Sequence, residues 1–388
     1  MTEKKCLIVA SVSSMIGQFI LPNIELLLSM GYHITVATNF TFGSTFSIAH
    51  AENLKNTLEN KNIEIYEIQF YRNIFDFKNI IAYRQIRSLI AMNNYSLIHC
   101  HSPIGGVITR LAARKKNCMM LKVMYTVHGF HFYKKAPFMN WLLYYPVEKF
   151  LSKYTDVLIT MNQEDYNFAG KKLKVKNIYN INGVGIDVKN YQILTSDKIT
   201  KRRECNIPAN AMIIISVGEL IKRKNHQIVI ETISKIKNNS LYYIICGQGK
   251  LKEKLFDLCR KHKLEHRVLF LGYRDDIIEL LHMSDIFLFP SIQEGLPVAL
   301  MEAMAAGLPC IASRIRGNVD LIVDGKGGIL CDVNNIDQYA DAISKIALDN
   351  NMRVNMGEYN RSILKKFDVS VAMNQLKKIY EENDSLQL

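Results

Sequence analysis

Short apolar runs rich in valine and isoleucine alternate along the chain with longer amphipathic stretches. The amphipathic stretches, such as residues 19–30 and 82–92, predict helices. Strands that alternate with helices form parallel sheets with helices on both faces, so the pattern predicts an α/β protein. The apolar runs predict twelve strands, at residues 6–10, 33–38, 64–68, 97–100, 123–127, 157–160, 178–181, 212–217, 242–246, 268–271, 286–289 and 310–312.

A polar segment with two glycines separates the first seven strands from the last five. It holds Gly183, Gly185 and the charged run 201–204, so we place the domain link at about residues 183–205. The expected architecture is two doubly wound, Rossmann-like domains, 1–185 and 186–388, that face each other across a cleft. The last helix, at about 366–388, is a candidate to pack back on the first domain. A single large sheet is the alternative.

The excess of basic over acidic residues lies mainly in the first half of the chain. Residues 1–190 hold 22 basic and 12 acidic residues, and residues 191–388 hold 27 and 24, which together give the net charge of +13. A basic first half favours an anionic partner: nucleic acid, a membrane surface or a phosphorylated substrate. The eight cysteines, Cys118 among them, lack metal-like spacing and indicate reduced thiols in a cytosolic protein.

The uncharged segment 6–24 follows Lys4 and Lys5 and so has some features of a targeting segment. Its continuous apolar run covers only residues 6–10, which is far shorter than the ~20 residues of a membrane helix. We therefore expect a strand, a loop and a helix here, with a targeting segment as the alternative.

Two loops in the second half have the composition of phosphate-binding loops. Gly218 ends a predicted strand, three cations at 222–224 follow, and a helix is expected from about His226. Cations beside a helix start suit phosphate, although a solvated surface loop is the alternative. Gly247 and Gly249 follow the next strand, where glycine lets the backbone approach a ligand. The third glycine of a dinucleotide fingerprint is absent, which argues against a nicotinamide cofactor.

The segment 289–309 is the most informative. Its strand ends at Pro290, the loop holds Glu294 and Gly295, and the helix is expected to begin with Pro297 in its first turn. Glu294 and Glu302 are poor ligands for an anion but good hydrogen-bond acceptors for the hydroxyls of sugar and ribose. For Glu302 a buried capping or salt-bridged residue is the alternative.

Glu294 and Glu302 match the E-x7-E signature of family four of the retaining glycosyltransferases, which have the GT-B fold. The flanking segments 294–297 and 302–309 also resemble that family, and the resemblance covers essentially the whole chain. Residues 126–133 and 140–146 are similar to a narrower group that builds bacterial capsule, exopolysaccharide or O-antigen repeat units.

The resemblance implies roles for individual residues. Glu294, Lys224 and His101 would serve catalysis: Glu294 binds the donor sugar hydroxyls, Lys224 the diphosphate, and His101 approaches the reacting carbon. Glu302 would bind ribose. The family often has arginine after the glycine at 218, where this chain has Glu219, so Arg223 is a candidate replacement. The further donor-binding positions are Gly17, Gly218, Gly247, Gly249, Tyr273, Gly295, Leu296, Pro297 and Val298.

Histidines and a polar loop end strands of the first half. We expect His99 and His101 to point to opposite faces of their strand, with His101 facing the cleft, which argues against a metal site made by the pair. A structural role for His101 is the alternative. His128 follows the predicted strand 123–127 and Asn39 follows the predicted strand 33–38, each at a carboxyl edge, and both are candidates for acceptor binding, or else for structural roles.

Residues 130–154 combine the single tryptophan and many other aromatic residues with four lysines. This composition suits the interface of an anionic bilayer. An ordinary core helix with solvated lysines is one alternative, and a surface that stacks single-stranded bases is a less favoured one. The expected location is cytoplasmic, peripheral on the inner face of the membrane, with no nucleic-acid partner.

The predicted function is retaining transfer of a hexose or N-acetylhexosamine from a nucleotide sugar, with UDP as the expected nucleotide, to a lipid-linked polyprenyl diphosphate saccharide. No Asp-x-Asp triplet and no metal-like cluster occurs, so we expect neither a metal nor another cofactor. The alternatives are a nucleotide-sugar epimerase of the same architecture and a non-enzymatic protein that binds polyanions or membranes.

Overall fold

The chain forms two compact units in a computed structural model that describes residues 4–44, 46–71, 73, 76–114, 121–193 and 197–384. The first unit comprises Met1–Val184 and Ser370–Leu388, and the second comprises Gly185–Val369. The chain therefore passes from one unit to the other twice. Cys118 lies outside the described residues.

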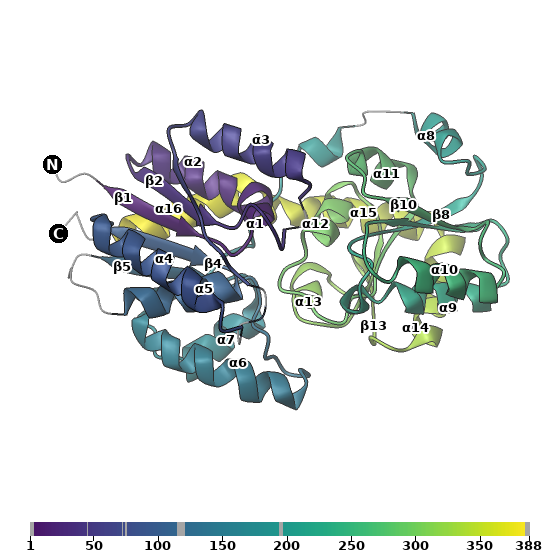
Figure 1. The fold of residues 1–388 in the computed structure, drawn as a ribbon. Coiled ribbons are helices and arrows are strands. Elements are labelled where there is room, and N and C mark those ends of the chain that lie inside the picture. The colour runs from purple at the N-terminus through teal and green to yellow at the C-terminus, as the bar shows by residue number, and fades with distance from the viewer. Residues whose placement is uncertain are drawn as a thin grey trace. The chain divides into compact units, whose positions relative to one another are not determined.

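The first unit is built on a seven-stranded parallel sheet with the strand order β3-β2-β1-β4-β5-β6-β7 (Figure 1). Its strands are β1 (Lys5–Val9), β2 (His33–Thr38), β3 (Glu64–Glu67), β4 (Leu97–His101), β5 (Lys122–Thr126), β6 (Val157–Thr160) and β7 (Asn177–Asn180). Its helices are α1 (Ser13–Met15), the π-helix η1 (Ile16–Ile20), α2 (Leu21–Ser29), α3 (Ile48–Glu59), α4 (Asn79–Met92), α5 (Pro103–Ala113), α6 (Phe138–Leu151), α7 (Gln163–Lys172) and α16 (Val369–Glu382).

The second unit has a six-stranded parallel sheet with the order β10-β9-β8-β11-β12-β13. Its strands are β8 (Met212–Val217), β9 (Leu241–Cys246), β10 (Val268–Gly272), β11 (Ile286–Phe289), β12 (Cys310–Ser313) and β13 (Gly328–Cys331). Its helices are α8 (Lys198–Glu204), α9 (His226–Lys235), α10 (Lys252–Lys261), α11 (Ile277–Met283), α12 (Val298–Ala305), α13 (Asn318–Leu321), α14 (Ile336–Leu348) and α15 (Asn350–Leu364).

The predicted α/β class with two doubly wound sheets is confirmed, and the single-sheet alternative is wrong. All twelve predicted strands are present, with ends shifted by a residue or so. Residues 6–24 form the buried strand β1 and then helical turns into α2, as expected. The strand β13 was missed. It has four residues and begins at Gly328, where a Cβ atom would lie 2.0 Å from the Cys310 carbonyl oxygen.

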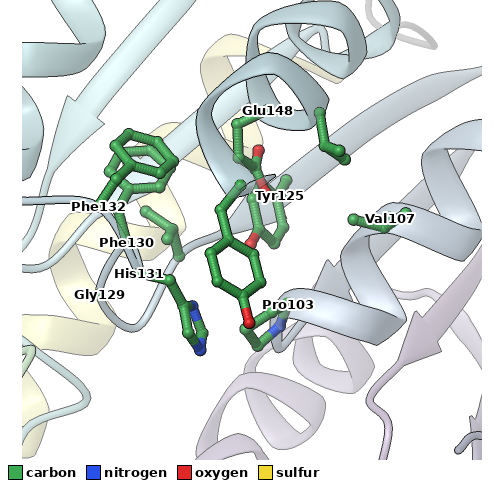
Figure 2. Close-up of a pocket in the computed structure, with 11 residues that line it drawn as sticks. Pro103, Val107, Tyr125, Gly129, Phe130, His131, Phe132 and Glu148 are labelled. Atoms are coloured by element: carbon green, nitrogen blue, oxygen red, sulfur yellow. The ribbon is translucent and has the colours of Figure 1, made fainter. Parts of the chain in front are cut away.

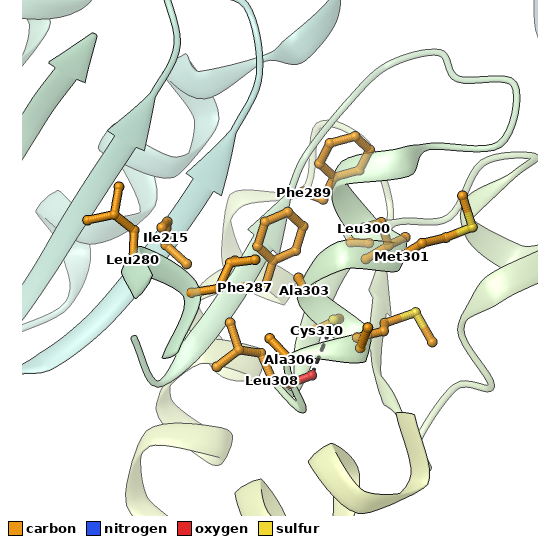
Figure 3. Close-up of a cluster of buried hydrophobic side chains, with 14 of the residues drawn as sticks. Ile215, Leu280, Phe287, Phe289, Leu300, Met301, Ala303, Ala306, Leu308 and Cys310 are labelled. Atoms are coloured by element: carbon orange, nitrogen blue, oxygen red, sulfur yellow. Dashed lines mark hydrogen bonds between the residues drawn. The ribbon is translucent and has the colours of Figure 1, made fainter. Parts of the chain in front are cut away.

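Apolar packing fixes the helix α12 against the strand β11. Phe287 and Phe289 of β11 are buried with Leu300 and Met301 of α12, and Figure 3 shows these side chains in one cluster. Their burial holds the loop between the two elements at the carboxyl edge of the sheet. This loop carries Glu294.

The last helix, α16, belongs to the first unit. The sequence analysis counted residues 186–388 as one domain but named the last helix, at about 366–388, as a candidate to pack back on the first. The structure confirms this candidate, because the chain returns to the first unit after Val369. In Figure 1 this yellow helix lies beside the strands of the first sheet. Leu376 and Tyr380 are buried there, Asn383 accepts a hydrogen bond from Asn177 at 2.8 Å, and Lys4 pairs with Asp384.

Candidate active site

A carboxylate paired with two cations follows strand β11. The Lys224 Nζ atom lies 2.8 Å and the Arg223 Nη1 atom 2.9 Å from Oε1 of Glu294. The side chains of Glu294 and Lys224 are only 9% and 13% exposed, whereas that of Arg223 is 39% exposed. Lys224 also lies over the Phe289 ring, 4.6 Å from its centroid. The structure therefore brings together three residues that the sequence analysis assigned to the donor.

Two opposing effects act on the Glu294 carboxyl. Burial alone raises its pKa, but the charges of Lys224 and Arg223 outweigh burial, and the net pKa is lowered. Glu294 is therefore ionised at neutral pH. An ionised carboxylate accepts hydrogen bonds from hydroxyl groups, while the two cations suit an anion such as a diphosphate.

The glycines of the neighbouring loops have a packing explanation in the structure. A Cβ atom on Gly247 would lie 2.0 Å from the Gly218 carbonyl oxygen, and one on Gly249 would lie 2.6 Å from that of Leu220. The Leu220 amide donates to the Gln248 carbonyl oxygen at 2.9 Å. These glycines let the loops after β8 and β9 hydrogen-bond, and their contact with a donor stays a prediction. A Cβ atom on Gly218 would lie 3.2 Å from the Lys224 stem, so the glycine leaves room for that side chain.

Two residues that the sequence analysis missed contact the main chain just before the start of α12. Arg316, which is buried, donates from Nε to the Glu294 carbonyl oxygen at 3.0 Å. A Cβ atom on Gly317 would lie 2.0 Å from the Gly295 carbonyl oxygen. Pro297 is the N-cap residue, one position before the first turn in which it was expected. The predicted donor-binding residues Gly295, Leu296, Pro297 and Val298 thus form one continuous, supported segment.

Glu302 is held by a tyrosine that no sequence motif indicated. The Tyr191 hydroxyl, on the short helix Asn190–Gln192, donates to Oε1 of Glu302 at 2.8 Å. Burial raises the pKa of Glu302, and this hydrogen bond opposes the rise. Within the described part of the chain no ion pair to Glu302 is found, which leaves its carboxylate with a neutral partner.

Two more positions of the second unit can be placed. Tyr273, in the loop after β10, is 54% exposed and interacts with Asp275. Glu219, at the position where the family often has arginine, is exposed, while Arg223 pairs with Glu294. The acid at 219 is therefore screened by solvent, and Arg223 is the second cation of the site.

His99 and His101 lie on the same face of β4, so the prediction of opposite faces is wrong. Alternate residues of a strand share a face, and the ring centroids are 4.2 Å apart. His128 follows, with its Nε2 atom 3.4 Å from Nδ1 of His101. Burial lowers the pKa of His99 to about 3, that of His128 to about 4 and that of His101 well below its usual value. All three are neutral at pH 7.

No metal site is found in the part of the chain that the structure describes, where His, Cys, Asp and Glu form no group of three suited to one.

Gly17 lies in η1, where a Cβ atom would be 2.7 Å from the Phe46 ring. Asn39 is buried, and its Oδ1 atom accepts from the amides of Thr41 and Phe42 at 2.9 Å each. This is the structural alternative for Asn39, and acceptor binding stays a prediction there and at His128.

Helix α6 divides the aromatic segment between core and solvent. Phe132, Trp141 and Tyr145 pack around Phe168 in the core of the first unit. The opposite side, which we call the α6 face, consists of the exposed side chains Phe138, Met139, Leu142 and Phe150, with exposed lysines at 134, 135, 149 and 153. The core alternative therefore holds for the inward aromatics, and the α6 face is a separate apolar and basic surface.

A small pocket opens beside the loop after β5 (Figure 2). Its lining includes Tyr125, His131 and Phe132, and its volume is about 20 Å³, which is room for one water molecule and not for a sugar ring. At its side Arg110 makes a buried two-pronged ion pair with Glu148, at 2.8 and 3.0 Å, and stacks on Tyr125. This region is packed structure and not an open binding site.

Family models match both units of the chain. The model described as glycosyl transferase 4-like matches residues 22–162, and the model described as glycosyl transferases group 1 matches residues 197–363. Among proteins, EpsD of Bacillus subtilis strain 168, named as a glycosyltransferase, is 33% identical over 97% of this chain and 96% of its own length. UDP-Gal:alpha-D-GlcNAc-diphosphoundecaprenol alpha-1,3-galactosyltransferase of Escherichia coli is 30% identical over 80% of this chain and 81% of its own length.

Solved structures agree in fold. The crystal structure of Anabaena Alr3699/HepE in complex with UDP and glucose has a TM-score of 0.79 at 19% identity and covers 98% of this chain and 100% of that one. WaaG, a glycosyltransferase involved in lipopolysaccharide biosynthesis, has a TM-score of 0.75 at 17% identity, with 96% and 99% covered. The family decides against the epimerase and the non-enzymatic alternatives. The chain belongs to the family-four, group 1 glycosyltransferases and is a transferase with the two Rossmann-like domains of the GT-B fold.

Proposed function

We propose that the protein transfers a hexose or N-acetylhexosamine from a UDP-sugar to a hydroxyl of a lipid-linked saccharide, with retention at the anomeric carbon, in the synthesis of a surface polysaccharide. The observation that carries the proposal is the pairing of Glu294 with Lys224 and Arg223 at the start of α12. The name of the Escherichia coli relative, which includes a UDP-galactose donor and a diphosphoundecaprenol acceptor, supports the substrate classes.

The chemistry follows from the charges in the site. The leaving UDP gains negative charge as the glycosidic bond breaks, and Lys224, Arg223 and the positive end of α12 stabilise it. Glu294 holds the sugar hydroxyls, and Glu302, oriented by Tyr191, holds the ribose hydroxyls. The donor phosphate takes the proton of the acceptor hydroxyl, so no protein base is assigned. Because protein cations supply the positive charge, we propose that no metal ion is required.

Thermal unfolding with nucleotides tests the donor assignment. We expect UDP to raise the melting temperature, GDP and ADP to have little effect, and one UDP-sugar to give the largest shift. The shift with UDP should be the same in EDTA as in Mg²⁺, because protein cations supply the positive charge. A ligand that binds only the folded protein raises its melting temperature by mass action. No shift with any nucleotide at millimolar concentration would contradict the donor site, and a shift that needs Mg²⁺ would contradict metal independence.

We propose further that the enzyme works at the cytoplasmic face of the membrane and meets anionic lipid through the α6 face. Its apolar side chains are among the most exposed in the first unit, with Phe138 at 77% and Leu142 at 55%. Lysines around an apolar stripe suit the interface of an anionic bilayer. No helix in the described residues is long and apolar enough to cross a membrane.

Co-sedimentation with liposomes tests the α6 face. Leu142→Glu is expected to reduce binding to vesicles that contain anionic lipid at least severalfold, because it places a charge in the stripe. Ile48→Glu is the matched control, since Ile48 on α3 is 85% exposed and lies outside this face. Equal losses in the two variants, or equal binding to neutral and anionic vesicles at low salt, would contradict the proposal.

A further inference from the structure

His99 is held at both ring nitrogens in the interior of the first unit. Its Nδ1 atom lies 2.8 Å from the hydroxyl of Tyr380, and its Nε2 atom lies 2.7 Å from Oγ1 of Thr126. Tyr380 comes from α16, 281 residues away in the sequence. All three side chains are buried. The ring of His99 therefore has one orientation that satisfies both of its nitrogens.

His101 packs against this fixed ring, and one of its nitrogens has no partner among the described residues. Its ring centroid is 4.2 Å from that of His99, with an angle of 36° between the rings. Its Nδ1 atom faces His128, while its buried Nε2 atom has no hydrogen-bond partner among the described residues. A buried imidazole nitrogen without a protein partner keeps its hydrogen-bonding capacity for a substrate hydroxyl or a water molecule.

The backbone next to His101 is strained. Ser102 has φ +63° and ψ 153°, a region occupied almost only by glycine, although it carries a side chain. Its hydroxyl is held by Ser11, at 3.1 Å from the Ser11 amide and 3.0 Å from the Ser11 hydroxyl. Strain of this kind persists where the surrounding structure imposes it, and it is concentrated at functional sites. The end of β4 is thus held in one conformation from both sides of His101.

We propose that Tyr380 is a positioning residue of the transfer reaction. Its hydroxyl fixes the ring of His99, and the ring of His99 in turn packs against that of His101 and holds it in place. This inference rests on the proposed role of His101 beside the reacting carbon. Tyr380 itself touches no substrate.

The two hydrogen bonds suit one tautomer of His99. Because a phenol is more acidic than an aliphatic hydroxyl, we assign Tyr380 as the donor to Nδ1 and the Nε2–H group of His99 as the donor to Thr126. The neutral form is assured by burial, which lowers the pKa of His99 to about 3. Removal of the phenol hydroxyl leaves Nδ1 without a donor in an apolar setting, which frees the ring to turn or to change its tautomer.

Tyr380→Phe tests the inference because it removes one hydroxyl and keeps the ring. We expect kcat to fall about ten- to a hundredfold, as a catalytic group displaced by part of an ångström would cause, while KM for the UDP-sugar changes less than twofold. Long-range ¹H–¹⁵N spectra should show altered ring-nitrogen shifts for both His99 and His101. Tyr95→Phe, at another buried tyrosine of the first unit that precedes β4, should leave kcat and these shifts unchanged.

A second variant separates this inference from the proposed function. If His101→Gln abolishes transfer but Tyr380→Phe keeps the wild-type kcat and imidazole shifts, the positioning role is wrong and the role of His101 stands. If His101→Gln transfers sugar at the wild-type rate, the proposed role of His101 is wrong. A lower melting temperature of Tyr380→Phe with unchanged kcat would show a purely structural role and would also overturn the inference.

Discussion

Replacement of Lys224 by alanine is expected to reduce kcat by about 10²–10³-fold, the effect of removing one preorganised group that stabilises charge in a transition state. Lys224 is the less exposed of the two cations on Glu294, and its aliphatic stem is packed against Gly218. The charge therefore has a fixed place and costs no reorganisation during the reaction. Initial rates with saturating UDP-sugar, below the melting temperature, give the measurement.

Stability changes in the same variant and must be measured with it. Loss of Lys224 leaves the buried Glu294 with only the more exposed Arg223, so the melting temperature is expected to fall as well. Lys222→Ala is the matched control, because Lys222 is an exposed cation of the same loop. Turnover of Lys224→Ala within a few-fold of the wild type, or an equal loss in Lys222→Ala, would contradict the assignment of Lys224 to the diphosphate.

Replacement of Glu294 by glutamine is expected to separate transfer from nucleotide binding. Hydrogen bonds to a charged acceptor contribute about 1.5–3 kcal/mol each, so kcat/KM for the UDP-sugar should fall at least about tenfold per hydroxyl lost. UDP alone should bind as tightly as before or more tightly, because Lys224 and Arg223 are no longer neutralised by the carboxylate. Calorimetric titration with UDP and transfer kinetics measure the two effects.

The comparison variant is Glu219→Gln, which removes an exposed carboxylate near the same loop. It should leave kcat/KM for the UDP-sugar within about twofold, since solvent screens an exposed charge. Weaker binding of UDP by Glu294→Gln would mean that Glu294 serves the fold of the loop and not the sugar. The ion pair would then be structural.

The sequence predicts the architecture well because buried parallel strands leave a strong local signal. Most of the predicted strands are runs of apolar residues, whereas β13 starts at a glycine that the neighbouring carbonyl requires. The segment from Glu294 to Glu302 could likewise be read from the order of loop, proline and helix. A prediction from sequence depends on the order of residues within such short segments.

Contacts between distant residues could not be read in this way. Tyr191 lies 111 residues from Glu302 in the sequence. Arg316 donates a side-chain hydrogen bond to the main-chain oxygen of Glu294, and every residue type has such an oxygen, so the sequence gives no sign of this contact. The glycines at 247 and 249 show a second limit, because close packing of two loops and close approach of a ligand require the same residue. The error at His99 and His101 was of another kind, since the two-residue period of a strand already places both on one face.

The return of the chain to the first unit has a consequence for biosynthesis. A ribosome makes a chain from its N-terminal end, so residues 1–184 emerge long before the helix that completes their core. Leu376 and Tyr380 reach their buried positions only after α16 has left the exit tunnel. The second unit, by contrast, is continuous in sequence and can complete its folding before the first unit does. Termination of translation before α16 would thus damage the half of the molecule that was translated first.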